Sequence, residues 1–423
     1  MRDAIQEFMD FNRPFARRNP ELIRFKIARM AEGPLAFLRG TFHLFARDVL
    51  EKAHDPLPLF TGEGPELDIV GDIHSENYGS FKADDNAVHY DVNDFDETTT
   101  GRFDFDVCRA AVSWHLAARE RGDTLAEAVQ ASLAAVGAYA DSLTHLIRKG
   151  RAPDFDVSES HPAGCGPVDE LVHAAAAAKR TAFIERLTEQ ADKGRRLLRS
   201  PRYFNLPDDE RALAERLLAD YLRRRSAPGD TDYYRVEDVC GRVSGIGSMG
   251  RLRYVLLLSG KGSADGRNVL LEFKEGRPSA YDICRKRAAD VLGRAERVIT
   301  AARASMAASS GHLGFAVDQG MSFQAREIGP ADARVDTRSL KSPALLADAL
   351  RVQAQILVRI HARAALRAVG PANPLAELVD PDAFCQRVLC FTLGYADIVR
   401  RDWLRFVGAR GDLENVSAWA GND

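Results

Sequence analysis

Acidic and amide side chains gather in two short stretches, Gly71-Asp72-Ile73-His74-Ser75-Glu76-Asn77 and Asn93-Asp94-Phe95-Asp96-Glu97. Each follows a short apolar segment typical of a strand, 67–70 and 88–92. Mg²⁺ prefers hard oxygen ligands, usually one or two carboxylates completed by phosphate and water oxygens. Asn77 and Asp94 are therefore candidate metal ligands, and Asp72 is the candidate base. Each stretch alone is more often a capped turn than a site, but together at strand ends they favour a metal site. We expect the two strands, joined by a polar turn at 82–86, to aim their carboxylates at one point.

A glycine-rich stretch, Ser244-Gly245-Ile246-Gly247-Ser248-Met249-Gly250, lies between two predicted strands. A dinucleotide-binding turn must open a helix, so this stretch is not of that type. In a glycine hairpin the backbone N–H groups can approach phosphate, although a plain turn is the simpler interpretation. Lys274 lies one strand further on, in an apolar segment where a buried ammonium needs an anionic partner. A nucleotide phosphate would supply it. The candidate nucleotide contacts are Gly245, Gly247, Ser248, Gly250 and Lys274.

The remaining pattern is helical, then β-rich, then helical. Apolar periodicity predicts helices to about residue 52 and over 106–146, 168–225, 280–308 and 343 to the end. Strands are predicted at 234–242, 252–259, 268–274, 315–318 and 322–328. We therefore expect an α+β protein of three parts: a helix-rich catalytic lobe over 1–230, a β-rich nucleotide-clamp lobe over 231–335, and a helical return over 336–423.

Composition excludes several classes of function. The 423 residues are 45% hydrophobic and 28% charged, which is ordinary for a globular protein. The net charge of −3 shows no basic footprint, so nucleic acid is not an expected partner. The chain has neither a signal-peptide start nor an apolar run of bilayer length, so we expect a cytoplasmic protein that does not enter a membrane. Its six cysteines lack the spacing of zinc ligands. Oligomeric state is not indicated.

The Asp72 stretch resembles the catalytic loop of the aminoglycoside- and choline-kinase-like branch of the protein-kinase-like superfamily. The segment from Asp94-Phe95-Asp96 to Phe105-Asp106-Val107 resembles the metal-binding turn, spacer and helix-anchoring aspartate that come after that loop in the same branch. The resemblance implies that Asp72 is the catalytic base and that Asp106 anchors the next helix to the loop. It implies ATP and Mg²⁺ as cofactors, with the metal on Asn77 and Asp94. The ATP phosphates would lie on the glycine loop and Lys274, and the best candidate to pair with Lys274 is Glu296, on the helix after that lysine.

The order of these elements differs from that of an ordinary kinase, in which the glycine loop and lysine precede the catalytic loop. The elements come in the kinase order if the chain is followed from about residue 232 to the C-terminus and then onward from the N-terminus. The resemblance therefore implies a two-lobed, circularly permuted protein-kinase-like fold, with a helix-rich large lobe and a small antiparallel β lobe. Over nearly its whole length the chain is similar to the bacterial domain-of-unknown-function 2252 family. The matching segments are 36–40, 71–77, 93–97, the Gly245 loop, 273–275 and 395–397.

The expected function is an ATP- and Mg²⁺-dependent phosphotransferase whose acceptor, a small-molecule hydroxyl in the simplest case, the sequence does not name. Two alternatives on the same fold are a non-catalytic ATP-binding module and a nucleotidyltransferase. A metallophosphoesterase also uses a strand-end Asp-x-His, but it needs further Gly-Asp-x-x-Asp and Gly-Asn-His segments that this chain lacks. We expect the acceptor to lie among residues 98–109 and 150–230.

Three neighbouring side chains have competing interpretations. His74 is expected to brace its loop by hydrogen bonds, with metal ligation as the alternative. Arg39 could reach a phosphate or form a buried structural ion pair. Met249 is expected to pack over the nucleotide.

Overall fold

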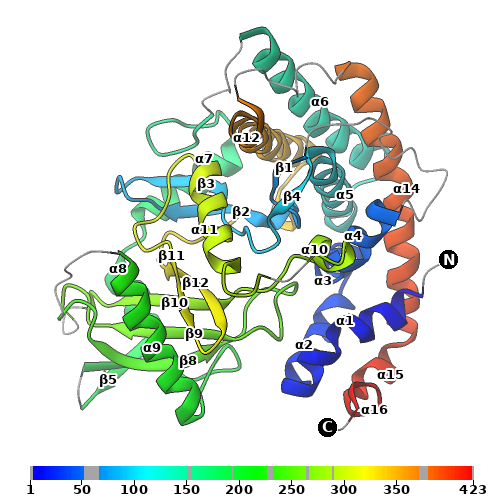
Figure 1. Cartoon of the computed structure of the whole chain (residues 1–423). Coiled ribbons are helices and arrows are strands. Elements are labelled where there is room, and N and C mark those ends of the chain that lie inside the picture. Colours follow the sequence, from blue (N-terminus) through cyan, green and yellow to red (C-terminus); the bar gives the residue numbers. More distant parts are fainter. Residues whose placement is uncertain are drawn as a thin grey trace.

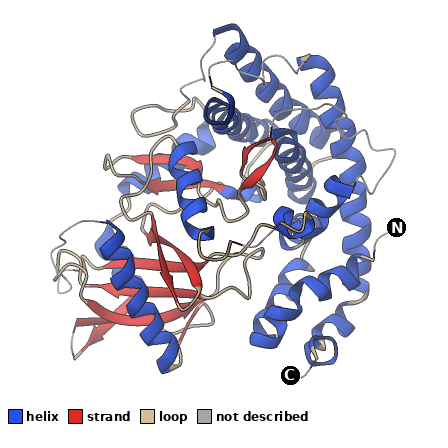
Figure 2. Cartoon of the chain, in the orientation of Figure 1, coloured by secondary structure: helices blue, strands red, loops and turns tan. Residues whose placement is uncertain are grey.

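The computed structural model describes residues 3–51, 66–149, 155–192, 194–225, 232–262, 266–287, 290–370 and 380–421. A helix-rich lobe faces a smaller lobe built on a six-stranded sheet (Figure 1), and the two lobes stand out by secondary structure in Figure 2. The paired strands are antiparallel throughout the described residues. The α+β class predicted from the sequence is therefore confirmed.

The helix-rich lobe combines segments from both ends of the chain. Its main helices are α1 (Ala4–Arg18), α2 (Pro20–Met30), α3 (Pro34–Gly40), α4 (Phe42–Glu51), α5 (Phe103–Arg121), α6 (Leu125–Lys149), α7 (Gly166–Ala177), α12 (Pro343–Val369) and α14 (Pro381–Gly408). The short helices α15 (Arg410–Glu414) and α16 (Val416–Ala420) end the described chain, and α16 packs beside α1 (Figure 1). Two small hairpin-like sheets complete the lobe: β1 (Glu66–Ile69) with β4 (Thr99–Arg102), and β2 (Tyr78–Lys82) with β3 (Val88–Val92).

The large sheet has the strand order β11-β12-β10-β9-β8-β7. Its strands are β7 (Tyr203–Phe204), β8 (Val236–Arg242), β9 (Arg253–Leu258), β10 (Val269–Glu275), β11 (Gly314–Asp318) and β12 (Met321–Ile328). Successive residues of a strand face opposite sides. On β10, Leu271 and Phe273 pack in the hydrophobic cluster beneath α9 (Asp208–Arg225), so Glu272 and Lys274 face the other side, toward the helix-rich lobe.

The face of the sheet turned toward the helix-rich lobe is covered in part by the segment before α9. This segment holds α8 (Arg180–Leu187), β5 (Thr188–Ala191) and β6 (Gly194–Leu197), and side chains from α8, β6 and β7 pack on the apolar end of the sheet. Residues from about 180 onward therefore belong with the sheet, upstream of the predicted start of the β-rich lobe at 231. The predicted boundary between 230 and 231 itself lies outside the described residues.

Several predicted elements differ from those observed. The segments 67–70 and 88–92 do not pair with each other: β1 pairs with β4, and β3 pairs with β2, a strand that the sequence analysis missed. Gly79 and Ser80 weaken the strand propensity of β2, which forms because all its residues but Lys82 are buried. The predicted helix 168–225 is interrupted by β5, β6 and β7, and the predicted helix 280–308 is split into α10 (Ala280–Cys284) and α11 (Arg294–Ser305).

Helix α12 runs through the middle of the helix-rich lobe and carries a buried ion pair. Both oxygens of Asp91, on β3, accept hydrogen bonds from Arg359 Nη2 at 2.6 Å, and both side chains are almost fully buried. A buried charge without its partner is strongly destabilising, so this pair ties β3 to α12. None of the helices in the described ranges is both long and apolar enough to cross a membrane.

We expect Arg359→Met to lower the free energy of unfolding by about 3–5 kcal/mol, because it leaves the Asp91 carboxylate buried and unpaired. The matched control is Arg351→Met on the same helix, whose pair with Asp348 is about half exposed on both sides and should cost at most about 1 kcal/mol. Urea denaturation of the two variants measures the difference. Equal losses would contradict the role given to the Asp91 pair.

Candidate functional site

The loop after β1 is anchored by Asp106 at the start of α5. Its two carboxylate oxygens accept hydrogen bonds from the backbone N–H groups of Val70 at 2.7 Å and Gly71 at 2.9 Å. His361 Nε2 on α12 lies 3.3 Å from the same carboxylate. The predicted role of Asp106, tying its helix to this loop, is confirmed.

Gly71 allows this loop to approach the acidic turn at 94–97. Its φ is +91°, and a Cβ atom at this position would lie 2.3 Å from the carbonyl oxygen of Glu97. Only glycine tolerates both this conformation and this contact. Thr98 Oγ1 donates to the Ile69 carbonyl at 2.7 Å, so the loop and the turn are joined on both sides of the glycine.

The β2–β3 hairpin places Asn77 and Asp94 next to each other. Tyr78 pairs with Val92, and the N–H of Asn93 donates to the Asn77 carbonyl at 2.9 Å. Adjacent strand ends were predicted from the sequence, and they come from a different pair of strands, β2 and β3. The two predicted metal ligands are therefore neighbours.

The oxygen ligands offered by Asn77 and Asp94 suit Mg²⁺ only if a substrate supplies further oxygen ligands. The Asn77 Oδ1 atom already accepts the His74 N–H at 2.8 Å, which leaves it one lone pair. The Asp94 side chain is 44% exposed toward the cleft. In the part of the chain that the structure describes, no group of three or more His, Cys, Asp or Glu side chains is arranged to hold a metal. One amide and one carboxylate suit an ion that keeps water and takes phosphate oxygens.

Asp72 is held by Arg109 of α5. Arg109 donates to Asp72 Oδ1 from Nε at 3.0 Å and from Nη2 at 2.5 Å, and it also donates to the Leu38 carbonyl at 2.8 Å. The guanidinium is fully buried against the rings of Phe42 and Phe45. Burial raises the pKa of Asp72 to about 7, although Arg109 opposes the rise. A carboxyl group with this pKa is suited to proton transfer near neutral pH.

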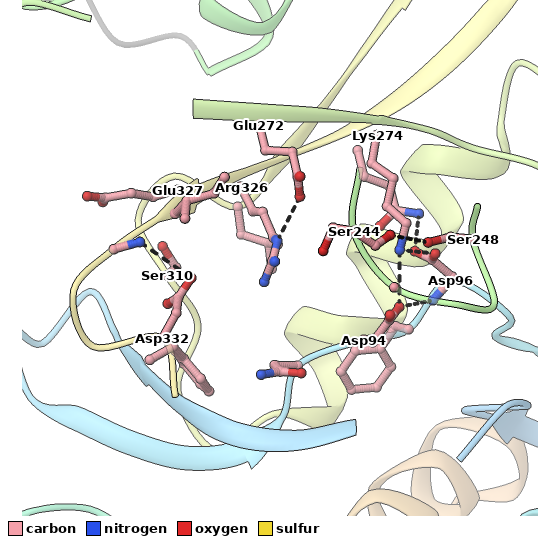
Figure 3. A pocket seen from close by; sticks show the side chains of 18 of the residues that line it. Asp94, Asp96, Ser244, Ser248, Glu272, Lys274, Ser310, Arg326, Glu327 and Asp332 are labelled. Atoms are coloured by element: carbon pink, nitrogen blue, oxygen red, sulfur yellow. Dashed lines mark hydrogen bonds and ion pairs between the residues drawn. The ribbon is translucent and has the colours of Figure 1, made fainter. Parts of the chain in front are cut away.

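Lys274 reaches across from the sheet to the acidic turn. Its ammonium forms an ion pair with Asp96 and lies 3.5 Å from Asp94 Oδ1 (Figure 3). Burial lowers the pKa of Lys274, and the two carboxylates partly offset this effect. Glu296, predicted to pair with Lys274, is instead exposed on α11, and this expectation is corrected. The position of Asp96 two residues after Asp94 was the signal in the sequence that could have identified it as the partner.

The same turn is held by further side chains of the sheet lobe. Arg251 contacts Glu97 at 2.6 Å and Asp96 at 3.4 Å, and Gln324 Nε2 donates to Asp96 Oδ1 at 3.0 Å. Burial would raise the pKa of Asp96, but Lys274 and the neighbouring arginines hold it well below its usual value. Asp96 is therefore a permanent anion at the centre of the contact between the lobes.

The glycine loop lies directly over Asp72. A Cβ on Gly247 would lie 3.6 Å from Asp72 Oδ2, so there is little room between the loop and the candidate base. Ser248 Oγ donates to the Ser244 carbonyl at 3.2 Å and accepts from Arg253. Gly245 and Gly250 both have positive φ, at +72° and +96°. Of the four predicted contacts of this loop, Gly245, Gly247 and Ser248 line the cleft, whereas Gly250 does not and is buried.

Met249 has a different place from the one predicted. It is buried with Ile246 in the hydrophobic cluster formed by the N-terminal helices, not over the space beside Lys274. Gly250 approaches the same helices, since a Cβ there would lie 2.6 Å from the Cβ of Phe15. The tip of the glycine loop is therefore docked on the helix-rich lobe by apolar contacts.

His74 and Arg39 follow the structural interpretations. His74 Nδ1 accepts the Glu76 N–H at 3.2 Å, so the imidazole braces the loop as predicted. Burial lowers the pKa of His74 well below its usual value, which keeps the ring neutral. Arg39 forms an ion pair with Glu76 at 2.8 Å, the second of the two alternatives considered for it.

These elements surround a cleft of about 1420 Å³ between the lobes. Asp94, Asp96 and Lys274 lie at one end of it, and Glu327 and Asp332 at the other (Figure 3). The segment after β12 closes the back of the cleft, where the Ala333 carbonyl accepts the Ser80 N–H of β2 at 2.8 Å. A deep cleft with converging carboxylates, a lysine and a glycine loop is the usual form of a ligand site.

Fold and site together define a two-lobed α+β protein with a charged cleft between its lobes. The chain belongs to the family described as "Uncharacterized protein conserved in bacteria (DUF2252)", whose profile matches residues 18–409. No curated protein and no solved structure matches the chain.

We expect Gly71→Ala to destabilise the protein more than Gly122→Ala. Both glycines have positive φ, which costs an alanine about 1–2 kcal/mol, but a Cβ at Gly122 would have no heavy atom within 4 Å whereas one at Gly71 would collide with the Glu97 backbone. The loss for Gly71→Ala should therefore exceed that for Gly122→Ala in chemical denaturation. Equal losses would mean that the loop and the acidic turn are not packed as described.

Proposed function

We propose that this protein is an ATP- and Mg²⁺-dependent phosphotransferase with a circularly permuted protein-kinase-like fold. The observation that carries the proposal is the contact of Lys274 with the Asp94–Asp96 turn. Strand β8 leads into the glycine hairpin, and Lys274 lies on β10, the third strand when β8 is counted as the first. The phosphate-binding lysine of protein kinases also lies on the third strand. Asp72, Asn77 and Asp94 line the same cleft from the other lobe, and the proposal gives them the roles of the base and the two metal ligands of kinases.

The arrangement of α12 supports the permuted order. Arg367, near the end of α12, lies 4.0 Å from Asp68 of β1, so the end of this helix is next to the strand that leads into the Asp72 loop. In an unpermuted chain, a short connection from α12 to β1 would be enough. In this chain α12 instead leads into the C-terminal helices, and β1 comes after the N-terminal helices.

In the proposed reaction, the acceptor hydroxyl oxygen attacks the γ-phosphorus of ATP and the bond to the ADP oxygen breaks. Asp72 Oδ2, which Arg109 leaves free, takes the hydroxyl proton. Lys274 exchanges its contact with Asp94 for the phosphates, and the N–H groups of the glycine loop shield their charge. Mg²⁺, bound by Asn77 and Asp94, would neutralise the phosphate oxygens. Arg109 positions Asp72 and does not touch the substrate.

Turnover of ATP tests this proposal directly. With water in the place of the acceptor hydroxyl, we expect the wild-type chain to release phosphate from ATP in the presence of Mg²⁺. We expect Asp72→Asn and Asp94→Ala to reduce the rate by about 10²–10⁴-fold. Asp348→Asn, an exposed carboxylate on α12, is the control and should leave the rate unchanged. Formation of AMP in place of ADP would identify a nucleotidyltransferase. ATP binding without any turnover would identify a non-catalytic module, and no binding of any nucleotide would refute both.

The pKa of Asp72 predicts a pH profile for this turnover. The base must be deprotonated to accept a proton, and burial raises its pKa to about 7. The rate should therefore rise about tenfold per pH unit below 7 and level off above it. The Asp348→Asn control should show the same rising limb. A rate that stays level between pH 5 and 8 would show that Asp72 is not the base.

A further inference from the structure

Three arginines surround one glutamate on the face of the sheet turned toward the cleft. Glu272 of β10 accepts hydrogen bonds from Arg253 Nη1 at 3.2 and 3.3 Å and from Arg326 Nε at 3.3 Å, and it pairs with Arg242 as well. The arginines come from β9, β12 and β8. Burial would raise the pKa of Glu272, but the three guanidinium groups hold it well below its usual value.

This cluster carries more positive charge than its glutamate can neutralise. The side chains of Arg242 and Arg253 are only 5% and 6% exposed, and among the described residues their Nε atoms have no hydrogen-bond partner. Buried cationic donors without acceptors are costly. Asp332 lies on the loop after β12, where its charge acts on Arg326 and Arg242 but the residue is exposed to solvent. The unpartnered Nε donors of Arg242 and Arg253 are therefore the feature that points to a further anion.

The face of the sheet that carries Glu272 and the three arginines forms one wall of the cleft, and the open part of this wall is polar. Arg326 is 37% exposed, and it lies beside Glu272 in the middle of the wall, between Lys274 and Asp332 (Figure 3). The apolar part of the same face is already buried by side chains from α8, β6 and β7: Ile184, Leu197 and Tyr203. A nucleobase therefore finds little free apolar surface on the sheet here, whereas a phosphate group finds three guanidinium groups.

We propose that Arg242, Arg253 and Arg326 form a phosphate-binding subsite in the cleft, separate from the contact of Lys274 with the acidic turn. Guanidinium forks match phosphate oxygens in pairs, so unused donors around Glu272 suit a phosphate monoester or a polyphosphate chain. The phosphate belongs either to a nucleotide or to a phosphorylated acceptor. The inference rests on the charge and geometry of the wall and does not require the transfer reaction.

Inorganic phosphate and tripolyphosphate are the probes. Titration calorimetry of the full chain should show both binding to the wild type, and Arg326→Gln should weaken them at least tenfold. Arg326→Lys keeps the charge but loses the paired N–H donors of the guanidinium group, so its affinity for both probes should lie between those of the wild type and Arg326→Gln. Arg216→Gln is the control, since Arg216 lies on α9 and pairs with Asp318 outside the cleft. Unliganded melting curves verify that Arg326→Gln remains folded, because Glu272 keeps two arginine partners in that variant.

Two further ligands identify the source of the phosphate. If it belongs to the nucleotide, Arg326→Gln will weaken ATP binding and leave adenosine binding unchanged. If it belongs to the acceptor, ATP affinity will be unchanged and inorganic phosphate will bind the ATP-saturated protein. Equal affinity of both probes for wild type and Arg326→Gln, or no binding of either to the wild type, would overturn the proposal. Failure of the proposed reaction would instead appear as phosphate binding without ATP turnover.

Discussion

The arrangement of the cleft depends on the ion pairs and hydrogen bonds that hold one acidic turn, residues 94–98, against the sheet lobe. Lys274 pairs with Asp96, Arg251 pairs with Glu97, and Arg294 donates to the carbonyls of Asp96 at 2.6 Å and Thr98 at 2.7 Å. Each of these cations would be costly to bury alone, so the turn must remain where they converge. The cleft is consequently charge-balanced at this end without a ligand, and a phosphate that approaches Lys274 must compete with carboxylates already there.

The N-terminal helices support the opposite side of the site. Ile246 and Met249 anchor the glycine loop in the apolar cluster of these helices, and α3 contributes the carbonyl that Arg109 uses while it holds Asp72. Glycine loop and candidate base are therefore positioned by the same group of helices. This arrangement makes the first part of the chain, which carries none of the predicted ligands, a support for the whole site.

The α+β class could be predicted from the sequence. So could the grouping of Asp72, Asn77, Asp94 and Lys274 in one site, because their motifs are local and lie at or in strands with a clear apolar pattern. It missed the features that depend on tertiary contacts. Strand β2 forms despite weak propensity because its surroundings bury it. The partner of Lys274 was sought on the next helix, yet the acidic turn of the other lobe supplies it. No local pattern reveals that three arginines on three different strands meet at Glu272, since strand register alone brings them together.

The proposed function requires that one cleft binds ATP and a divalent cation between Lys274, Asn77 and Asp94. A crystal structure with a non-hydrolysable ATP analogue and Mn²⁺, located by its anomalous signal, tests it most directly. We expect the metal between Asn77 Oδ1 and the Asp94 carboxylate, with phosphate oxygens completing its coordination and Lys274 contacting the phosphates. An analogue bound outside the cleft, or a metal coordinated without either residue, would contradict it.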